Sequence, residues 1–321
     1  MDDEQISKLK EGMGAELIET HISWVFLKDG FVYKIKKPVK FSFLDFSTLE
    51  KRKELCEEEV RLNRRLAPDI YLDVVPVAGG GGVVALESGG EPLDYAVKMR
   101  RLPQERRMDT LLSKGKVTEE DIEEIAGIVA DFHKRIDSIS DKKYSSADVV
   151  KEQIDDLGSF GKIIEKACGL GGQVDYVLEK CDSFIEGNRA LFDKRQAEGR
   201  IKDCHGDLHS ANIFLTDGIV IFDCIEFSRD FRYVDVSSEI AFMAMDLDAF
   251  GRSDFSRLFI DKYVELSGDE EALLLLTLYK CYRANVRAKI AAIEYSQHPG
   301  DDAKERIRKY MGLAERYAKG L

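Results

Sequence analysis

The pattern of hydrophobic and polar positions changes character once along the chain. Up to about residue 102, short apolar or alternating runs are separated by glycine-rich or Asp-Gly turns, which is typical of antiparallel strands. Four glycines at 79–82 predict a hairpin turn rather than a phosphate loop, because no Lys-Ser/Thr pair and helix follow them. The predicted strands begin near Leu17 and cover 23–28, 31–36, 71–77, 83–86 and 95–99.

One helix is predicted inside this strand-rich part, over residues 48–66, before Pro68. A glutamate on an apolar stripe costs free energy unless a cation pairs with it. For Glu59, which lies on such a stripe, the expected partner is Lys34 on the strand 31–36. One alternative is that Glu58 takes the place of Glu59, and another is that Glu59 is solvated. The stripe recurs at spacings of four, three and four: Leu55, Glu59, Leu62 and Leu66.

From about residue 105 the periodicity is mainly helical. Thr118 and Asp121 resemble a capping box at the start of an amphipathic helix over 118–137. Two or three helices are predicted over 147–200, and further helices over 236–319. The order of elements predicts an α+β fold with two parts, residues 1–102 and 103–321, the second with a helical insertion at about 144–200.

The second part contains one stretch rich in candidate chemistry, His-Gly-Asp-x-x-x-x-Asn at 205–212, followed by Asp223. The Asp-Gly pair at 217–218 between apolar runs predicts a two-residue hairpin turn. Pairing outward from this turn sets Asn212 opposite Asp223, with Cβ atoms roughly 4.5–5.5 Å apart. An amide and a carboxylate so placed can hold one hard cation. With the carboxylate of Asp207 in the preceding loop, this arrangement suits phosphoryl transfer.

Composition restricts the class of function. The chain of 321 residues has 48 basic and 60 acidic residues, a formal charge of −12, which argues against nucleic acid as the main partner. An acidic surface is compatible with a cationic substrate but is usually only a solubility feature. The six cysteines are scattered without a Cys-x-x-Cys pair, which indicates reduced thiols. We expect a cytoplasmic protein without a signal peptide or a membrane segment.

The candidate site residues described above resemble those of the aminoglycoside phosphotransferase and choline kinase group, which has the bilobal protein-kinase-like fold. The resemblance covers roughly residues 15–310. Segments at 20–27, 33–38 and 243–247 are similar to a branch of uncharacterised prokaryotic predicted kinases. The resemblance implies an N-lobe that binds nucleotide and consists of an antiparallel sheet plus one helix. A larger, mainly helical C-lobe with a catalytic β-hairpin would bind the acceptor. The residues that carry the resemblance are Lys34, Glu59, His205, Gly206, Asp207, Asn212 and Asp223.

By this resemblance the protein would transfer the γ-phosphoryl group of ATP, with Mg²⁺, to a hydroxyl group of a small molecule. Asp207 would be the catalytic base, and Asn212 and Asp223 would bind the metal. Lys34 would hold the α- and β-phosphates and be fixed by Glu59, and the segment from Met99 to Leu102 would meet adenine. The residues expected at the nucleotide are Ser23, Lys34, Glu59, Met99, Arg100 and Leu102.

Two departures from the family pattern leave alternatives open. The loop at 20–23 that would cover the phosphates has no glycine, and Cys224-Ile225 follows Asp223. A non-catalytic or regulatory ATP-binding protein is therefore an alternative. A metal-dependent hydrolase that uses His205, Asp207 and His209 is another, and nucleotidyl transfer is not excluded.

Two assignments within the kinase hypothesis also stay open. Lys36 shares a strand face with Lys34 and could take its role. Acidic residues could form a wall for amine acceptors, although charged helix positions are more often solvated. The insertion offers Asp155, Asp156, Glu165, Asp175 and Glu179, and the C-terminal part offers Glu226, Asp246 and Asp248. Arg229 and Arg232 could contact an anionic acceptor, although such arginines more often pair with nearby carboxylates.

Overall fold

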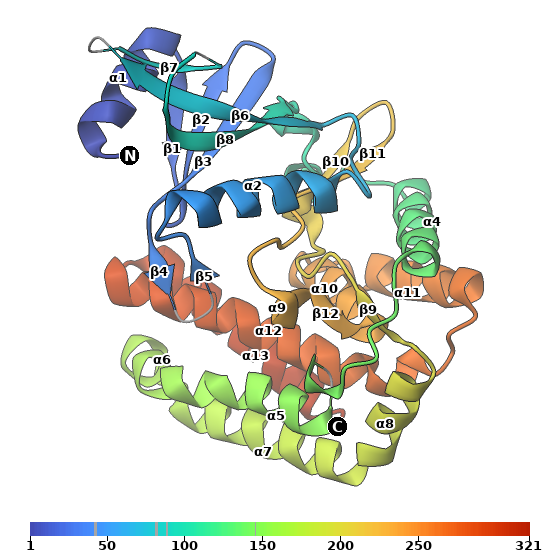
Figure 1. Ribbon diagram of the computed structural model, residues 1–321. Coiled ribbons are helices and arrows are strands. Elements are labelled where there is room, and N and C mark those ends of the chain that lie inside the picture. The colour runs from blue at the N-terminus through green and yellow to red at the C-terminus, as the bar shows by residue number, and fades with distance from the viewer. Residues whose placement is uncertain (42–43, 81–82, 88, 145) are drawn as a thin grey trace. The chain divides into compact units, whose positions relative to one another are not determined.

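The computed structural model describes residues 1–41, 44–80, 83–87, 89–144 and 146–321, which form two compact units (Figure 1). Unit 1 contains residues 1–107 and 212–229, and unit 2 contains residues 108–211 and 230–321. These units do not coincide with the predicted lobes, 1–102 and 103–321, because the segment 212–229 groups with the N-terminal residues. The lobe boundaries and their assigned roles stay predictions.

A twisted antiparallel sheet forms the centre of unit 1, and the predicted strands are confirmed (Figure 1). Asp29 takes a positive φ of 51° in the two-residue turn that joins Lys28 to Phe31. The predicted glycine turn lies partly outside the described residues, at 81–82. In the order β1-β2-β3-β8-β6-β7, the strands are Glu16–Glu19, Ser23–Lys28, Phe31–Lys36, Pro92–Arg100, Tyr71–Gly80 and Val83–Leu86. A separate pair joins β4 (Lys40–Phe41) and β5 (Leu44–Asp45).

Two helices add apolar side chains to separate clusters on this sheet. Helix α1 (Asp3–Met13) packs on β7, and α2 (Leu49–Asn63) packs on β6 and β8. Thr48 caps α2, which confirms its predicted start, but the helix ends three residues before Leu66. Leu55 and Leu66 are only half-buried. The face that α2 buries is rotated from the predicted stripe: Arg52, Cys56, Glu59, Val60, Leu62 and Asn63.

The register predicted for the hairpin around residues 217–218 is wrong by one residue. Strands β10 (Ile213–Leu215) and β11 (Ile219–Ile221) pair Leu215 with Ile219, so the connection has three residues rather than two. Thr216 leaves the strand because its backbone N–H and its hydroxyl both donate to the carbonyl of Gly218, at 3.0 and 2.9 Å. The backbone of Asn212 accordingly meets Phe222, whose N–H donates to its carbonyl at 3.1 Å. Asp223 therefore lies one position beyond the predicted pair.

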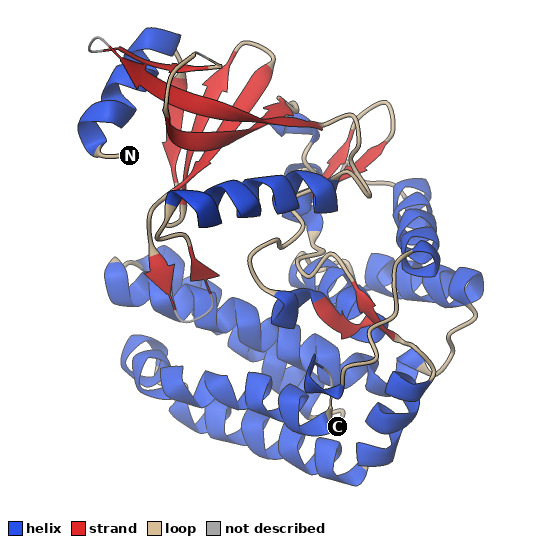
Figure 2. Cartoon of the chain, viewed as in Figure 1, coloured by secondary structure: helices blue, strands red, loops and turns tan. Residues whose placement is uncertain are grey.

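Unit 2 is mainly helical, which confirms the α+β class and the helical second part (Figure 2). The capping box of Thr118 and Asp121 is confirmed at α4, and the described part of 147–200 contains four α-helices rather than two or three. The helices are α3 (Met108–Ser113), α4 (Glu119–Arg135), α5 (Ala147–Asp155), α6 (Gly161–Cys168), α7 (Gly171–Gly187), α8 (Arg189–Ala197), α9 (Arg229–Arg232, which starts at the unit boundary), α10 (Val236–Ala249), α11 (Ser253–Ser267), α12 (Ala272–Gln297) and α13 (Asp301–Ala318). Short 3₁₀ turns are η1 (Gln104–Arg106, in unit 1), η2 (Lys142–Tyr144), η3 (Asp156–Phe160) and η4 (Ser210–Asn212).

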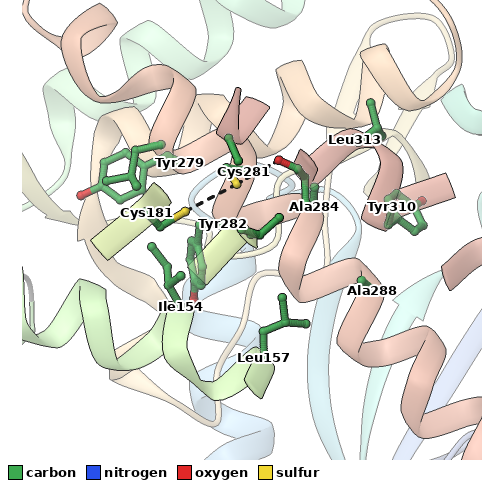
Figure 3. Close-up of a cluster of buried hydrophobic side chains, with 14 of the residues drawn as sticks. Ile154, Leu157, Cys181, Tyr279, Cys281, Tyr282, Ala284, Ala288, Tyr310 and Leu313 are labelled. Atoms are coloured by element: carbon green, nitrogen blue, oxygen red, sulfur yellow. Dashed lines mark hydrogen bonds between the residues drawn. The ribbon is translucent and has the colours of Figure 1, made fainter. Parts of the chain in front are cut away.

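The core of unit 2 lies where α12 and α13 pack on each other and on α7 and α10. Figure 3 shows Ile154 and Leu157 beside the aromatic rings and small residues of these helices. The buried Cys181 and Cys281 thiols form a hydrogen bond with a sulfur–sulfur distance of 3.6 Å. In the described parts of the chain, no helix combines the length and the apolar character that a bilayer crossing requires.

Candidate active site

Unit 1 contains a cavity of about 500 Å³ with mostly apolar walls, formed by residues of the sheet and of the β10–β11 hairpin. Such a cavity with a few convergent polar groups is the usual form of a small-molecule site. Glu59 is not among the lining residues, because it is fully buried on α2. Of the residues predicted to act on nucleotide or metal, the cavity brings together Ser23, Lys34, Met99, Arg100, Leu102 and Asp223.

Lys34 joins two carboxylates at this cavity. Its Nζ lies 2.9 Å from Oε1 of Glu59 and 3.0 Å from Oδ1 of Asp223. The predicted pairing of Lys34 with Glu59 is confirmed. The alternative residue Glu58 instead accepts hydrogen bonds from Arg61, at 2.7 Å. The ammonium group is thus fixed on one side by a buried glutamate and directed toward a half-exposed aspartate.

Lys36 extends this pair into a chain of alternating charges. Its side chain is only 1% exposed, and its Nζ lies 2.6 Å from Oε2 of Glu59 and also donates to Glu226. The order of groups is therefore Asp223, Lys34, Glu59, Lys36 and Glu226, which we call the charge chain. The charge chain ties β3 and α2 to Asp223 and Glu226, the two ends of the segment 223–226 after the β10–β11 hairpin.

Burial and neighbouring charge act in opposite directions on these groups. Burial would lower the pKa of Lys34, but Asp223, Glu59 and Glu226 raise it well above its ordinary value. Burial would raise the pKa of Glu59, but Lys34 and Lys36 outweigh burial and lower it. For Glu226 burial prevails, and its pKa is raised. Glu59 and the lysines are therefore charged at neutral pH, and Glu226 is the member most easily protonated.

Local backbone contacts set the position of Asp223. It has a positive φ of 64°, a conformation that aspartate tolerates better than most residues. Its N–H donates to the hydroxyl of Tyr71 at 3.1 Å, and the next N–H, of Cys224, donates to Oδ1 of Asn63 at 2.8 Å. The chain therefore turns at Asp223 and is held on α2 and β6, beside Lys34.

The glycine-free loop before β2 is closed by its own side chains. The N–H and hydroxyl of Thr20 both donate to the carbonyl of Ser23, at 2.9 and 3.1 Å, and the N–H of Ser23 donates back to the hydroxyl of Thr20. The hydroxyl of Ser23 is buried and has no hydrogen-bond partner among the described residues, although it belongs to a residue that lines the cavity. A buried polar group without a partner is costly, and a polar ligand group would remove that cost.

In unit 2, a short strand pair presents the segment 204–207. Strand β9 (Ile201–Asp203) pairs with β12 (Tyr233–Asp235), and the N–H of Cys204 donates to the carbonyl of Arg232 at 3.0 Å. Gly206 then takes a φ of 87°, which favours glycine because it has no Cβ. The ring of His205 accepts the N–H of Asp207 at 3.3 Å. The backbone bonds to the neighbouring segment thus end at Cys204, and the local contacts of His205 and Gly206 follow.

Helix α10 holds this loop with side chains spaced along one face. Glu239 accepts the N–H groups of His205 and Gly206, at 2.6 and 2.9 Å. One turn later Phe242 packs on the ring of His209, with 5.2 Å between centroids. A further turn along, Asp246 accepts the N–H of Ser210 at 2.9 Å as well as its hydroxyl. Because helical neighbours recur every three or four residues, one helix face fixes the whole loop.

Asp207 itself is about one-third exposed, and its Oδ2 lies 3.4 Å from Nε2 of His209. Burial raises the pKa of Asp207, but its neighbours His209, His205 and Arg287 outweigh burial and hold it below its ordinary value. Burial lowers the pKa of His209, but Asp207 raises it overall. Asp207 is therefore ionised at neutral pH and can accept a hydrogen bond or a proton.

Of the acidic residues predicted as a possible amine-binding wall, the three of the C-terminal part are each engaged in other contacts. Glu226 pairs with Lys36, and Asp246 accepts two hydrogen bonds from Ser210. Asp248 pairs with Lys280 and accepts the hydroxyl of Tyr317. These three carboxylates therefore bind groups of the protein itself and give no support to a cationic acceptor.

The ligand set of the metal-dependent hydrolase does not assemble. Among the described residues, the group of three or more His, Cys, Asp or Glu ligand atoms that all lie within 4.8 Å of one another is His133, Cys204 and Glu239. His205, Asp207 and His209 form no such group there.

Sequence reasoning missed several residues of the site. Lys36 was considered only as a substitute for Lys34, whereas both lysines bind Glu59. Their shared strand face was the available signal, but the position of Glu226 after the hairpin could not be read from spacing. The roles of Tyr71, Asn63 and Glu239 also depend on contacts between segments far apart in the sequence.

Comparisons with known proteins agree with this architecture. The chain is 34% identical, over 293 residues, to uncharacterised proteins of Mycobacterium tuberculosis and Mycobacterium bovis. The match covers 90% of this chain but only 57% of those relatives, so the chain spans little more than half their length.

Two solved structures share the fold at low identity. A choline/ethanolamine kinase family protein from Mesorhizobium loti has a TM-score of 0.54 and 13% identity, covering 98% of this chain and 94% of its own. A thermostable mutant of an aminoglycoside phosphotransferase, in a ternary complex with AMP-PNP and hygromycin B, has a TM-score of 0.52 and 12% identity over the full length of both chains. At this identity the likeness establishes the protein-kinase-like fold alone.

The family follows from a model of the phosphotransferase enzyme family, which matches residues 32–275. This range runs from the strand of Lys34 to the start of α12 and includes the loop of Asp207 and the hairpin of Asp223. Since it covers well over half of the 321 residues, the chain belongs to the phosphotransferase enzyme family.

Proposed function

We propose that the protein is a small-molecule kinase that uses ATP and Mg²⁺ to phosphorylate a hydroxyl group. The observation that carries this proposal is the cavity of unit 1, where Lys34 is held between Glu59 and Asp223. A fixed cation beside a carboxylate, at the edge of an apolar cavity, suits a nucleotide whose base is apolar and whose phosphates are charged.

The residues present fit the nucleotide and the metal. The unpartnered hydroxyl of Ser23 and the ammonium of Lys34 offer hydrogen bonds to phosphate oxygens. Asn212 and Asp223 supply the amide and carboxylate oxygens that Mg²⁺ prefers. Magnesium, when bound, neutralises charge on the β- and γ-phosphates. The AMP-PNP complex of a protein with the same fold further supports ATP as the donor.

Asp207 is proposed as the base. Its ionised carboxylate would accept the proton of the acceptor hydroxyl while the hydroxyl oxygen bonds to the γ-phosphorus and the bond from phosphorus to the leaving oxygen of ADP breaks. Glu239, Phe242 and Asp246 would keep the loop in place during this step. Asp207→Asn keeps the shape of the side chain but removes its negative charge, so it isolates this role.

The proposal is tested by two measurements on the same protein. Calorimetry should detect Mg²⁺-dependent binding of AMP-PNP, and pools of hydroxyl compounds incubated with ATP should yield a product heavier by one phosphoryl group. Nucleotide binding should survive in Asp207→Asn while phosphoryl transfer is lost. Undiminished transfer by this variant would refute the assignment of the base.

A second function, regulatory ATP binding without transfer, is favoured by one observation. The loop at 20–23 is closed by bonds between Thr20 and Ser23 and has no glycine. The same measurements separate the two functions, because a regulatory protein would bind AMP-PNP but phosphorylate no compound in any pool.

A further inference from the structure

Arg287 on α12 and Lys309 on α13 are two cationic side chains of unit 2 that share contacts with Tyr310, and Arg287 lies near Asp207. On α12, Arg283 donates to the carbonyl of Gly206 at 3.2 Å, and Arg287 follows one helical turn later on the same face. Arg287 donates to the hydroxyl of Tyr310 on α13 at 3.3 Å. Lys309, the residue before Tyr310, has its Nζ 5.6 Å from the centroid of that ring.

Neither cation has an acidic partner. Among the described residues, no carboxylate oxygen lies within 4.0 Å of the guanidinium of Arg287 or the ammonium of Lys309. Their contacts are with aromatic groups: Arg287 with Tyr310, and Lys309 with Phe250 and Tyr310. Arg287 is half-buried, so its charge is partly removed from water without an ion pair.

Three other cations on the same two helices are each paired with a carboxylate. Lys280 binds Asp248, Lys289 lies 2.9 Å from Asp156, and Arg306 binds Glu294. The chain has 60 acidic residues for 48 basic ones, so acidic partners are plentiful. Arg287 and Lys309 have no such ion pair among the described residues.

The anions in this neighbourhood are already assigned. Asp246 is bound to Ser210, and Glu239 is bound to the N–H groups of the loop. Burial lowers the pKa of Arg287, but Tyr310, Asp246 and Asp207 raise it overall, and Arg287 in turn helps to lower the pKa of Asp207, which agrees with their proximity. The guanidinium and the ammonium thus remain available to a ligand that approaches Asp207.

We propose that Arg287 and Lys309 bind an anionic group of the acceptor, so that the substrate is a hydroxyl compound that also carries a phosphate or a carboxylate. This inference rests on the proposed kinase function. The planar fork of arginine matches the oxygens of both groups, and lysine adds a point charge. The reaction is the transfer described above, with the acceptor oxygen bonding to phosphorus as ADP leaves.

The first test compares acceptors that differ in charge. Three sets of hydroxyl compounds are incubated with ATP and Mg²⁺: sugar phosphates and hydroxy acids, neutral sugars and polyols, and amino sugars with amino alcohols. We expect transfer to members of the anionic set. Preference for a neutral or cationic acceptor would overturn the inference and leave the kinase function intact.

The second test removes the two cations one at a time. Arg287→Gln and Lys309→Gln should each raise KM for the anionic acceptor by roughly 10- to 100-fold, the range expected for a charge-assisted hydrogen bond, with kcat largely retained. Lys289→Gln is the matched control, because it removes a lysine from α12 whose partner is Asp156. Lys309 is exposed, so its replacement is compatible with folding. Equal KM values in all three variants would refute the assignment.

If no compound is phosphorylated, that outcome counts against the kinase function itself. The proposed anion site is then tested by a binding measurement. Inorganic phosphate, added at constant ionic strength, should raise the thermal unfolding midpoint of the wild-type protein more than that of Arg287→Gln or Lys309→Gln. The difference between variants removes any contribution of phosphate bound near Lys34. An equal rise in wild type and variants would overturn the anion site.

Discussion

Replacing Lys36 by methionine tests the charge chain of unit 1. The lysine is 1% exposed and bonds to Glu59 and Glu226, whose side chains are 0% and 5% exposed. Removing one partner of a buried ion pair costs about 3–5 kcal/mol, since the other charge stays buried without compensation. Glu59 keeps Lys34, so the penalty falls on Glu226, which can take up a proton. We therefore expect Lys36→Met to lower the free energy of unfolding by about 3 kcal/mol at pH 7, the lower end of this range.

The assay is urea unfolding followed by the fluorescence of Trp24, the single tryptophan, which lies in the core of unit 1. A loss of this size lowers the urea midpoint by roughly 1–3 M for a slope of 1–3 kcal/mol/M. Lys98→Met is the matched control, because Lys98 lies in the same sheet and pairs with the half-exposed Glu87. An exposed pair contributes about 0–1 kcal/mol. Equal midpoints for the two variants would refute the reasoning.

The pH dependence of Lys36→Met provides an independent check. Burial already raises the pKa of Glu226, and loss of Lys36 removes the largest effect that lowers it. A carboxyl with a raised pKa in the folded state stabilises that state at low pH, and this contribution is lost as pH rises through the folded pKa. The variant should therefore be closer to wild type at pH 5 than at pH 8. Adding Glu226→Met should restore most of the stability at pH 8, because the unpaired charge is gone.

Three further predictions concern the proposed reaction. Asp207→Asn should reduce phosphoryl transfer by about 10²- to 10⁴-fold in a product assay, with an unchanged unfolding midpoint. Asp223→Ala should abolish the Mg²⁺ dependence of nucleotide binding in calorimetry; an unchanged magnesium titration would contradict its role. Glu239→Gln weakens the two hydrogen bonds from His205 and Gly206 and should cost about 1.5–3 kcal/mol in thermal unfolding. It should also lower transfer while AMP-PNP binding persists, and a loss confined to nucleotide binding would disprove its link to the loop.

Local patterns predicted much of the fold because they depend on near neighbours. The turn at Asp29-Gly30, the capping box of Thr118 and the alternation that puts Lys34 and Lys36 on one strand face are all found in the structure. The register predicted for the hairpin around residues 217–218 is wrong for an equally local reason. Thr216 bonds to Gly218 and adds one residue to the turn, a preference that the Asp-Gly pair does not reveal.

The sequence by itself determined the types of group available for catalysis and their order, from Lys34 and Glu59 to Asp207, Asn212 and Asp223. Only the tertiary structure decided which charges compensate one another. It placed Lys36 against Glu226, 190 positions away, and left Arg287 and Lys309 without an acidic partner among the described residues. Pairing of buried charges depends on packing between distant segments, and composition or periodicity carries no record of it.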